Sequence, residues 1–406
     1  MTGTDLRGVN PGHRTAALLT PAGRGAVATI RIVEIRTNPP LENIAEGMIG
    51  IDSFFKASNG LSIADQPVSR IVFGKWGQTN VEELVVCRPA PGVLEIHCHG
   101  GDAAARRILD DLESAGYQTV NWRDQVVQAT DLLDAECLEV LSLTTTWKAT
   151  GIVIEQSSGL LRTAFETLRR TEPEDESTIH SALDGLLKWA AIGLHLSTPW
   201  SVVLTGRPNV GKSSLINALL GYERAIVFDQ PGTTRDIVTG ETAFDGWPVS
   251  LADTAGIRDH AGELEAAGIA MARRKLETAD LRLVLIDVSQ PPVDDDDRLL
   301  AQWPDSLIVA HKSDLPDQWG NRLPERALKV SSVTGEGMIE LQRRLVQQLV
   351  PESPPPGTAI PMTMRQIGLL QAARIATSSD ERRHAIECLF GGCCGSLLPE
   401  RQQHIA

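Results

Sequence analysis

The sequence is poor in cysteine and in aromatic residues, and it has no long apolar run. Its 406 residues include 6 cysteines and 4% aromatic residues. The cysteines form no Cys-x-x-Cys pair, which argues against a disulfide framework and against a zinc site. No apolar stretch approaches the length of a membrane span, and the polar, glycine-rich residues 1–14 lack the apolar core of a secretory signal. We therefore expect a cytoplasmic protein that has no membrane partner.

Basic residues are outnumbered by acidic ones. The chain has 38 lysines and arginines against 52 aspartates and glutamates, for a net charge of -14. This surplus opposes nonspecific attraction to nucleic acid. Any contact with RNA is expected to come from a local patch or through a partner.

The most informative feature that is present is a complete phosphate-binding loop. Residues 206–213 read Gly-Arg-Pro-Asn-Val-Gly-Lys-Ser, after an apolar run at 201–205 and before a helix-type run at 214–220. The glycines allow backbone N–H groups to surround phosphates, Lys212 reaches the β- and γ-phosphates, and Ser213 offers a hydroxyl to Mg²⁺ at the start of a helix. The segment predicts binding of a nucleoside triphosphate.

The distribution of apolar residues divides the chain into four regions and predicts a multidomain α/β protein. Residues 1–120 combine short β-type runs with one helical stretch at 103–115, which is typical of a small α+β domain. Residues 121–199 and 351–406 carry helical spacing. Residues 200–350 alternate strands and helices, which predicts a Rossmann-like P-loop domain inserted in the helical domain.

The strands expected in this P-loop domain are apolar runs bounded by turn or helix signals: 202–205, 238–244, 249–253, 281–287, 307–311 and 328–331. Asp245-Gly246 predicts a hairpin turn between the second and third of them. The acidic run at 294–297 predicts a solvated loop.

Downstream segments point to guanine as the base. In the stretch His311-Lys-Ser-Asp314, the carboxylate of Asp314 would accept hydrogen bonds from N1–H and the exocyclic amine of guanine, which adenine does not present together. The chain thus resembles the translation-factor-like GTPases, whose usual motif is Asn-Lys-x-Asp, with His311 in the first position. The lost amide contact costs roughly 0.5–1.5 kcal/mol, or about 1–3 if a partner is left unsatisfied, and so about one or two decades of affinity. Specificity for GTP is expected to survive.

Hydrolysis requires a group that orients water and a positive charge that stabilises the transition state. Ile257 holds the position where Ras-like GTPases carry the water-orienting glutamine, so both functions must come from elsewhere. Asn209, together with the Gly232-Thr-Thr segment, offers oxygen ligands for a monovalent cation near the β–γ bridge. The alternative is that Asn209 only braces its turn.

Five segments of the chain are similar to sequence signatures of the TrmE/MnmE tRNA-modification GTPases. Two of them, 20–31 and 94–101, separate this family from the related Era and Der ribosome-assembly GTPases. The other three lie in the P-loop domain: 206–217, 229–236 and 253–258.

The resemblance implies a potassium-stimulated GTPase that forms a homodimer through its N-terminal domain and binds a tetrahydrofolate derivative there. With a flavoprotein partner similar to MnmG, it would add an aminomethyl-type group at C5 of the wobble uridine of tRNA. A second hypothesis is a GTP-regulated scaffold whose folate site has decayed. A third, a ribosome-assembly GTPase, is disfavoured because no KH-like basic segment follows residue 352.

The resemblance also implies roles for individual residues. Those implied to bind GTP are Asn209, Val210, Gly211, Lys212, Ser213, Ser214, Thr233, Thr234, Asp253, Thr254, Ala255, Gly256, His311, Lys312, Asp314, Ser331 and Ser332. The implied catalytic residues are Lys212, Thr234 and Glu265. The implied metal ligands are Ser213 and Thr234 for Mg²⁺, and Asn209, Phe228, Gln230 and Thr233 for K⁺.

Three of these assignments have simpler alternatives. Arg31 and Glu95 match the family's folate contacts, and Glu95 is as readily half of an inter-strand ion pair. Glu265 is alternatively a carboxylate favoured by a helix N-terminus. Cys393 or Cys394 stands for the family's terminal cysteine, although adjacent cysteines also occur as small buried apolar residues.

Overall fold

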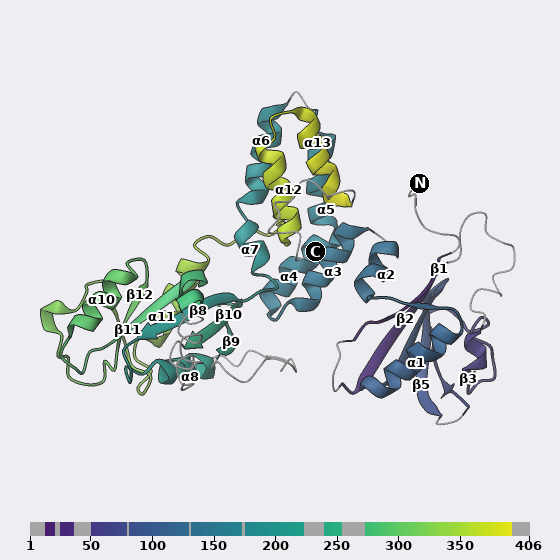
Figure 1. Ribbon diagram of the computed structural model, residues 1–406, viewed down its shortest axis with the longest axis horizontal. Coiled ribbons are helices and arrows are strands. Elements are labelled where there is room, and N and C mark those ends of the chain that lie inside the picture. The colour runs from purple at the N-terminus through teal and green to yellow at the C-terminus, as the bar shows by residue number, and fades with distance from the viewer. Residues whose placement is uncertain are drawn as a thin grey trace, which may run out of the picture. The chain divides into compact units, whose positions relative to one another are not determined.

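The computed structural model describes residues 13–20, 25–35, 50–78, 81–129, 131–172, 175–222, 239–253 and 273–391 (Figure 1). The chain divides into two compact units, residues 1–135 and 136–406. Within the described ranges, no helix is both long and apolar enough to cross a membrane.

The first unit is built on a seven-stranded sheet with the strand order β3-β4-β5-β6-β2-β1-β7. All neighbouring strands pair antiparallel except β1 and β7, which are parallel. The strands are β1 (His13–Leu18), β2 (Val27–Ile35), β3 (Phe55–Ala57), β4 (Ile71–Trp76), β5 (Glu82–Ala90), β6 (Val93–His99) and β7 (Gln118–Thr119), with a short helix η2 (Ile51–Ser53) before β3.

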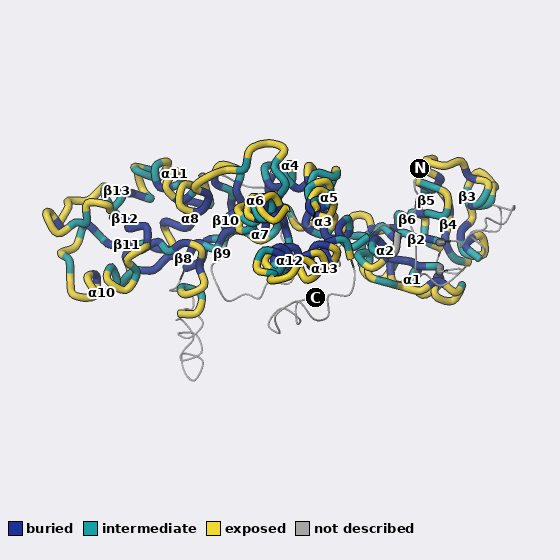
Figure 2. Tube along the Cα trace, turned by 90° about the horizontal axis from the view of Figure 1, so that it is seen from above, coloured by how far each residue is buried: buried dark blue, intermediate teal, exposed yellow. Residues whose placement is uncertain are grey.

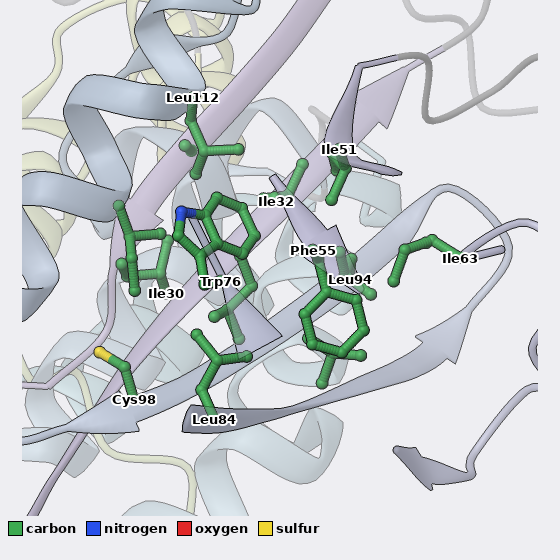
Figure 3. Packing of buried hydrophobic residues seen from close by; sticks show 14 of the residues in the cluster. Ile30, Ile32, Ile51, Phe55, Ile63, Trp76, Leu84, Leu94, Cys98 and Leu112 are labelled. Carbon is green, nitrogen blue, oxygen red and sulfur yellow. The ribbon is translucent and has the colours of Figure 1, made fainter. Parts of the chain in front are cut away.

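The helix predicted at 103–115 is confirmed as α1 (Asp102–Ser114), which covers one face of this sheet (Figure 1). Strand residues alternate between faces, so Ile30 and Ile32 of β2 point together into a core that also receives Leu112 of α1. Trp76 is fully buried there among these side chains (Figure 3). Its indole N–H donates to Asp111 Oδ2 at 2.8 Å. Each such large side chain contributes about 1.5–3 kcal/mol by leaving water.

Helix α2 (Trp122–Ala129) also belongs to the first unit. The side-chain amide of Gln125, which is buried, donates to Thr15 Oγ1 at 3.1 Å and to the carbonyl oxygen of Arg31 at 3.1 Å. The compact N-terminal unit therefore continues past residue 120, where the change in apolar pattern had placed a boundary.

The second unit contains a cluster of helices drawn from two distant parts of the sequence. Helix α12 packs against α6 and α13, and α13 packs against α5 (Figure 1). Glu136 is buried and accepts hydrogen bonds from Arg365 Nε at 2.6 Å and Gln366 Nε2 at 2.9 Å. The helices are α3 (Leu132–Leu143), α4 (Trp147–Glu155), η3 (Gln156–Leu160), α5 (Leu161–Arg170), α6 (Glu176–Leu187), α7 (Ala190–Leu194), α12 (Met364–Ile375), α13 (Ser379–Glu387) and η5 (Cys388–Phe390).

A six-stranded sheet with the order β13-β12-β11-β8-β10-β9 forms the rest of this unit. Its strands are parallel except for β9, which is antiparallel to β10. The central strands are the most buried part (Figure 2). The six predicted strands are confirmed as β8 (Trp200–Gly206), β9 (Thr239–Phe244), β10 (Trp247–Asp253), β11 (Leu281–Asp287), β12 (Leu307–His311) and β13 (Leu328–Val330).

The predicted hairpin turn between β9 and β10 is confirmed. Asp245 and Gly246 have φ values of 48° and 77°, the left-handed conformation that a two-residue hairpin loop of type I′ requires at both positions. The described helices around this sheet are α8 (Lys212–Tyr222), α10 (Asp294–Gln302), η4 (Gly320–Arg322) and α11 (Met338–Leu349).

The prediction of a solvated loop at 294–297 is wrong. The acidic run forms the first turn of α10, where carboxylates favour the helix dipole. Asp296 is only 2% exposed, and it accepts hydrogen bonds from the backbone N–H of Val293 and from Arg207 Nη1, both at 3.1 Å. A partner far away in the sequence therefore stabilises a charge that local pattern alone assigned to solvent.

Candidate nucleotide site

Three neighbouring parallel strands end at one edge of the six-stranded sheet. Gly206 ends β8, Asp287 ends β11 and His311 ends β12, with Leu285 paired to Gly206 and Asp287 paired to His311. The carboxyl edge of an open parallel sheet is where such folds bind ligands. The phosphate loop and the segment that begins at His311 therefore start side by side.

The phosphate loop leads directly into α8, which begins at Lys212. Lys212 is 6% exposed, and its ammonium donates to the carbonyl oxygens of Gly206 at 3.1 Å and Arg207 at 3.0 Å. The ammonium is thus folded back across its own loop, at the positive end of the helix dipole. This arrangement can receive a polyphosphate.

Gly211 is required in this loop for two reasons. Its φ is 101°, which L side chains rarely adopt, and a Cβ on it would lie 2.4 Å from Cε1 of His311. The phosphate loop and the imidazole therefore approach each other more closely than any side chain at this position would permit.

Ser213 and Asp253 lie together although 40 residues separate them in the sequence. The Ser213 hydroxyl donates to Asp253 Oδ2 at 2.7 Å, and Asp253, at the end of β10, is 2% exposed. Hydroxyl and carboxylate oxygens are ligands that suit Mg²⁺ when substrate phosphates complete its coordination. The donor set fits this ion, which would neutralise charge on the phosphate oxygens.

A buried serine fixes the carboxylate of Asp314, which is expected to contact the guanine base. Asp314 is exposed, and its Oδ1 accepts a hydrogen bond from the hydroxyl of fully buried Ser331 at 2.6 Å. The Ser331 oxygen in turn accepts the N–H groups of Val333 at 3.2 Å and Thr334 at 3.1 Å. A fixed, outward carboxylate is the acceptor that the N1–H and amine of guanine require.

His311 connects the phosphate loop to residues 311–314, the segment that is expected to contact the guanine base. It is 2% exposed; Nδ1 lies 2.8 Å from the carbonyl oxygen of Val210 and Nε2 lies 3.0 Å from the Ser332 hydroxyl oxygen. Burial lowers the pKa of His311, so the ring is neutral, with Nδ1–H donating to Val210 and Nε2 accepting from Ser332. Both ring nitrogens of His311 thus have a hydrogen-bond partner. The predicted decrease in GTP affinity remains a prediction.

Arg31 and Glu95 form the inter-strand ion pair that was one of the alternatives for them. Nε and Nη2 of Arg31 donate to the same Glu95 oxygen, Oε1, at 3.1 Å and 2.8 Å. His97 Nε2 lies 3.9 Å from the other oxygen, and His97 Nδ1 is hydrogen-bonded to Thr29 Oγ1 at 3.0 Å. A folate contact by these residues stays a prediction.

Of the remaining site predictions, three fall on described residues, and one of them is Lys312, whose ammonium contacts the carboxylate of Asp287. Ser214 is exposed within α8, and Asn209 is exposed with a φ of 61°. The predicted residues that lie outside the described ranges are Phe228, Gln230, Thr233, Thr234, Thr254, Ala255, Gly256, Glu265, Cys393 and Cys394.

Sequence reasoning missed Asp287. Its Oδ2 lies 2.5 Å from the ammonium of Lys312, which also donates to the carbonyl oxygen of Asn209 at 3.1 Å. Burial alone would raise the pKa of Asp287, but hydrogen bonds from Lys312 and Ser289 lower it overall. The signal that could have found this residue is its position, because it ends a strand at the same edge as Gly206 and His311.

Comparisons with known proteins agree with this geometry. Residues 201–312 match the family described as 50S ribosome-binding GTPase. The tRNA modification GTPase MnmE of Geobacillus kaustophilus is 32% identical over 346 residues, which cover 74% of this chain and 73% of that protein. The chain belongs to the MnmE family of tRNA modification GTPases. It is a GTP hydrolase, and Mg²⁺ and guanine nucleotide use follow from the MnmE family.

Two further similarities extend over different lengths. The MnmE protein of Lacticaseibacillus paracasei is 29% identical over 406 residues, 88% of this chain and 86% of that protein. Among solved structures, the G domain of the FeoB iron transporter of T. maritima is 29% identical, covers 37% of this chain and 98% of that chain, and has a TM-score of 0.28. The first of these shows that the similarity to MnmE includes regions on both sides of the P-loop domain.

Proposed function

We propose that this protein couples GTP hydrolysis to modification of C5 of the wobble uridine in tRNA, acting with a flavoprotein partner similar to MnmG. The proposed binding and hydrolysis of GTP rest on one observation: the edge of the sheet brings together Lys212, the Ser213–Asp253 pair and Asp314. The proposed modification of tRNA is supported by membership of the MnmE family. An aminomethyl-type group is the expected product.

Hydrolysis in this proposal is assisted by K⁺. Lys312 holds the backbone carbonyl of Asn209, and the exposed side-chain amide of Asn209 would present its oxygen toward the β–γ bridge of GTP. Phe228, Gln230 and Thr233 would complete the ligand set, with Thr234 joining Ser213 on Mg²⁺ and Glu265 positioning the water. Hydrolysis that is equally fast in Na⁺ and K⁺ would contradict this part.

The open face of the N-terminal sheet supports the proposed dimer and folate site. Ile71, Cys87, Glu95 and Arg31 are paired in one row across four strands, so their side chains share a face. Ile71 is 70% exposed at one end of the row, and Cys87 separates it from the Arg31–Glu95 pair. The apolar end suits a second copy of the chain, and the charged pair suits the polar edge and glutamate tail of a tetrahydrofolate derivative.

We further propose that the P-loop domain, residues 200–350, is inserted in a single helical domain. Support comes from the pairs that join the two helical segments: Arg374 Nε donates to Asp184 Oδ1 at 2.7 Å, and Gln156 Nε2 donates to the carbonyl oxygen of Thr358 at 3.1 Å. The P-loop domain would then have two connections to the helical domain, one at each of its ends.

Mass spectrometry of wobble uridines tests the modification directly. A strain that lacks the gene should lose the modified nucleoside, and the wild-type gene should restore it. A Lys212→Ala gene should not restore it, because the phosphate contact is lost. Unchanged tRNA in the deletion strain would contradict the proposal.

A GTP-regulated scaffold is the second candidate. It is favoured by one observation, that Arg31 and Glu95 satisfy each other without a ligand. A scaffold would bind and hydrolyse GTP, leave tRNA unmodified and bind no tetrahydrofolate, so the same deletion strain distinguishes the two candidates.

A further inference from the structure

Two consecutive residues, His311 and Lys312, donate hydrogen bonds to two consecutive carbonyl groups of the phosphate loop. Lys312 Nζ donates to the carbonyl oxygen of Asn209 at 3.1 Å, and His311 Nδ1 donates to that of Val210 at 2.8 Å. These contacts do not use the face of the loop on which phosphates bind.

Fixing these carbonyl groups also fixes backbone N–H groups. A trans peptide is planar, and its C=O and N–H point in opposite directions. The carbonyl of Asn209 belongs to the same peptide as the N–H of Val210, and the carbonyl of Val210 to the same peptide as the N–H of Gly211. Holding both oxygens on the His311 side therefore directs both N–H groups away from it, toward the inside of the loop, where the N–H of Val210 lies 3.4 Å from the carbonyl oxygen of Arg207.

The positive φ of Asn209 makes such support necessary. At 61° the residue is in the left-handed region, which a residue with a Cβ rarely adopts, and rotation about its N–Cα bond toward negative φ would relieve it. The Lys312 contact opposes that rotation because the rotation would carry the carbonyl oxygen of Asn209 away from the ammonium.

Each of the two donors is itself held by another partner. Ser332 faces the second nitrogen of His311 at 3.0 Å, and Asp287 Oδ2 faces the ammonium of Lys312. The Asp287 side chain is 13% exposed, and its other oxygen accepts the backbone N–H of Ser289 at 2.9 Å. Asp287 is thus anchored by the chain and points one oxygen at Lys312.

We propose that Asp287 is a positioning residue for nucleotide binding, which holds Lys312 on the carbonyl of Asn209 and so keeps the phosphate loop in its binding geometry. Asp287 acts through Lys312. Without its charge, the Lys312 ammonium is drawn to water, the Asn209–Val210 peptide loses its restraint, and the loop spends part of its time in conformations that do not bind phosphate.

Asp287→Asn tests this, because the amide keeps an oxygen for Ser289 and loses the charge that faces Lys312. GTP and GDP should both bind about tenfold more weakly, the loss of one charge-assisted contact. The kcat at saturating GTP should change less than about threefold, and the preference for GTP over ATP should persist because Asp314 is untouched. Asp317→Asn is the matched control: it breaks the neighbouring Asp317–Lys329 pair, at 3.1 Å, and should leave nucleotide binding unchanged.

A double-mutant cycle separates positioning from a general loss of folding stability. Lys312→Met alone should weaken binding by at least as much as Asp287→Asn, and in that background Asp287→Asn should have no further effect. Asp287→Glu, which keeps the charge, should bind within about threefold of wild type and covers the case in which the asparagine variant does not fold. Additive losses, or equal losses for the glutamate and asparagine variants, would overturn the proposal.

Discussion

Two ion pairs, one in each unit, use a basic side chain in opposite ways. In the nucleotide site, Lys312 contacts Asp287 and still donates to the backbone of the phosphate loop. On the N-terminal sheet, Nε and Nη2 of Arg31 both donate to one oxygen of Glu95. The first pair supports a third group and is ready for a ligand, whereas the second is satisfied by itself and must open before it can bind one.

Because the Arg31–Glu95 pair is partly exposed to solvent, opening it requires little free energy. The Arg31 and Glu95 side chains are 36% and 20% exposed, and pairs of this kind contribute about 0–1 kcal/mol. A ligand that offers its own carboxylate to Arg31 replaces one charge-assisted contact by another. The comparison therefore predicts two sites that differ in preorganisation and can be disrupted separately.

The largest expected effect comes from Lys212→Ala. This change removes two charged hydrogen bonds to the phosphates, each worth about 1.5–3 kcal/mol, so kcat/KM for GTP should decrease at least a hundredfold. A phosphate-release assay measures it. Tetrahydrofolate binding should be unaffected, and a parallel loss of it would show that the two sites are not separate.

Asp314→Asn should change the base preference of the nucleotide site. An amide donates to the C2 carbonyl of xanthine, whereas it meets the amine of guanine donor to donor. GTP affinity should decrease about a hundredfold, and xanthosine triphosphate should bind better than to wild type, as competition against a fluorescent nucleotide would show. Unchanged GTP affinity would exclude Asp314 as the guanine contact.

Local sequence patterns predicted the residues of the nucleotide site better than they predicted the long-range contacts that hold those residues in place. The six strands and the turn at Asp245-Gly246 follow from short-range apolar patterning and turn chemistry. Asp287 and Asp296 were missed because their partners, Lys312 and Arg207, are brought to them only by the fold. The contacts of Gln125 in α2 were missed for the same reason, because Thr15 and Arg31 lie 110 and 94 positions away in the sequence.

The buried imidazole of His311 predicts a loss of stability in acid. Burial lowers its folded pKa below the ordinary value of 6.5, while Lys312, Asp287 and Asp314 face it with mixed charge. Between these two pKa values the unfolded chain binds more protons, so stability is complete above pH 6.5 and is lost as the pH falls from there toward the folded pKa. The loss is about 1.4 kcal/mol per pH unit at most.

Thermal unfolding from pH 7.5 to 5.5 measures this effect. His311→Asn keeps a donor and an acceptor but does not titrate, so its melting temperature should decrease less over the same interval. Parallel curves for wild type and variant would place the acid sensitivity elsewhere.

The smallest effect is expected for Arg31→Ala. Because the pair is partly exposed, the free energy of unfolding should decrease by about 1 kcal/mol or less, as urea titration would show. Nucleotide affinity should not change. A loss of several kcal/mol would identify Arg31 as a structural residue and weaken its proposed role toward folate.

The most direct test of two separate sites is calorimetric titration of GDP and of tetrahydrofolate into wild type, Lys212→Ala and Arg31→Ala. We predict that wild type binds both ligands, that Lys212→Ala loses only GDP, and that Arg31→Ala loses only tetrahydrofolate. Wild type that binds no tetrahydrofolate, or a single variant that loses both ligands, would contradict the account.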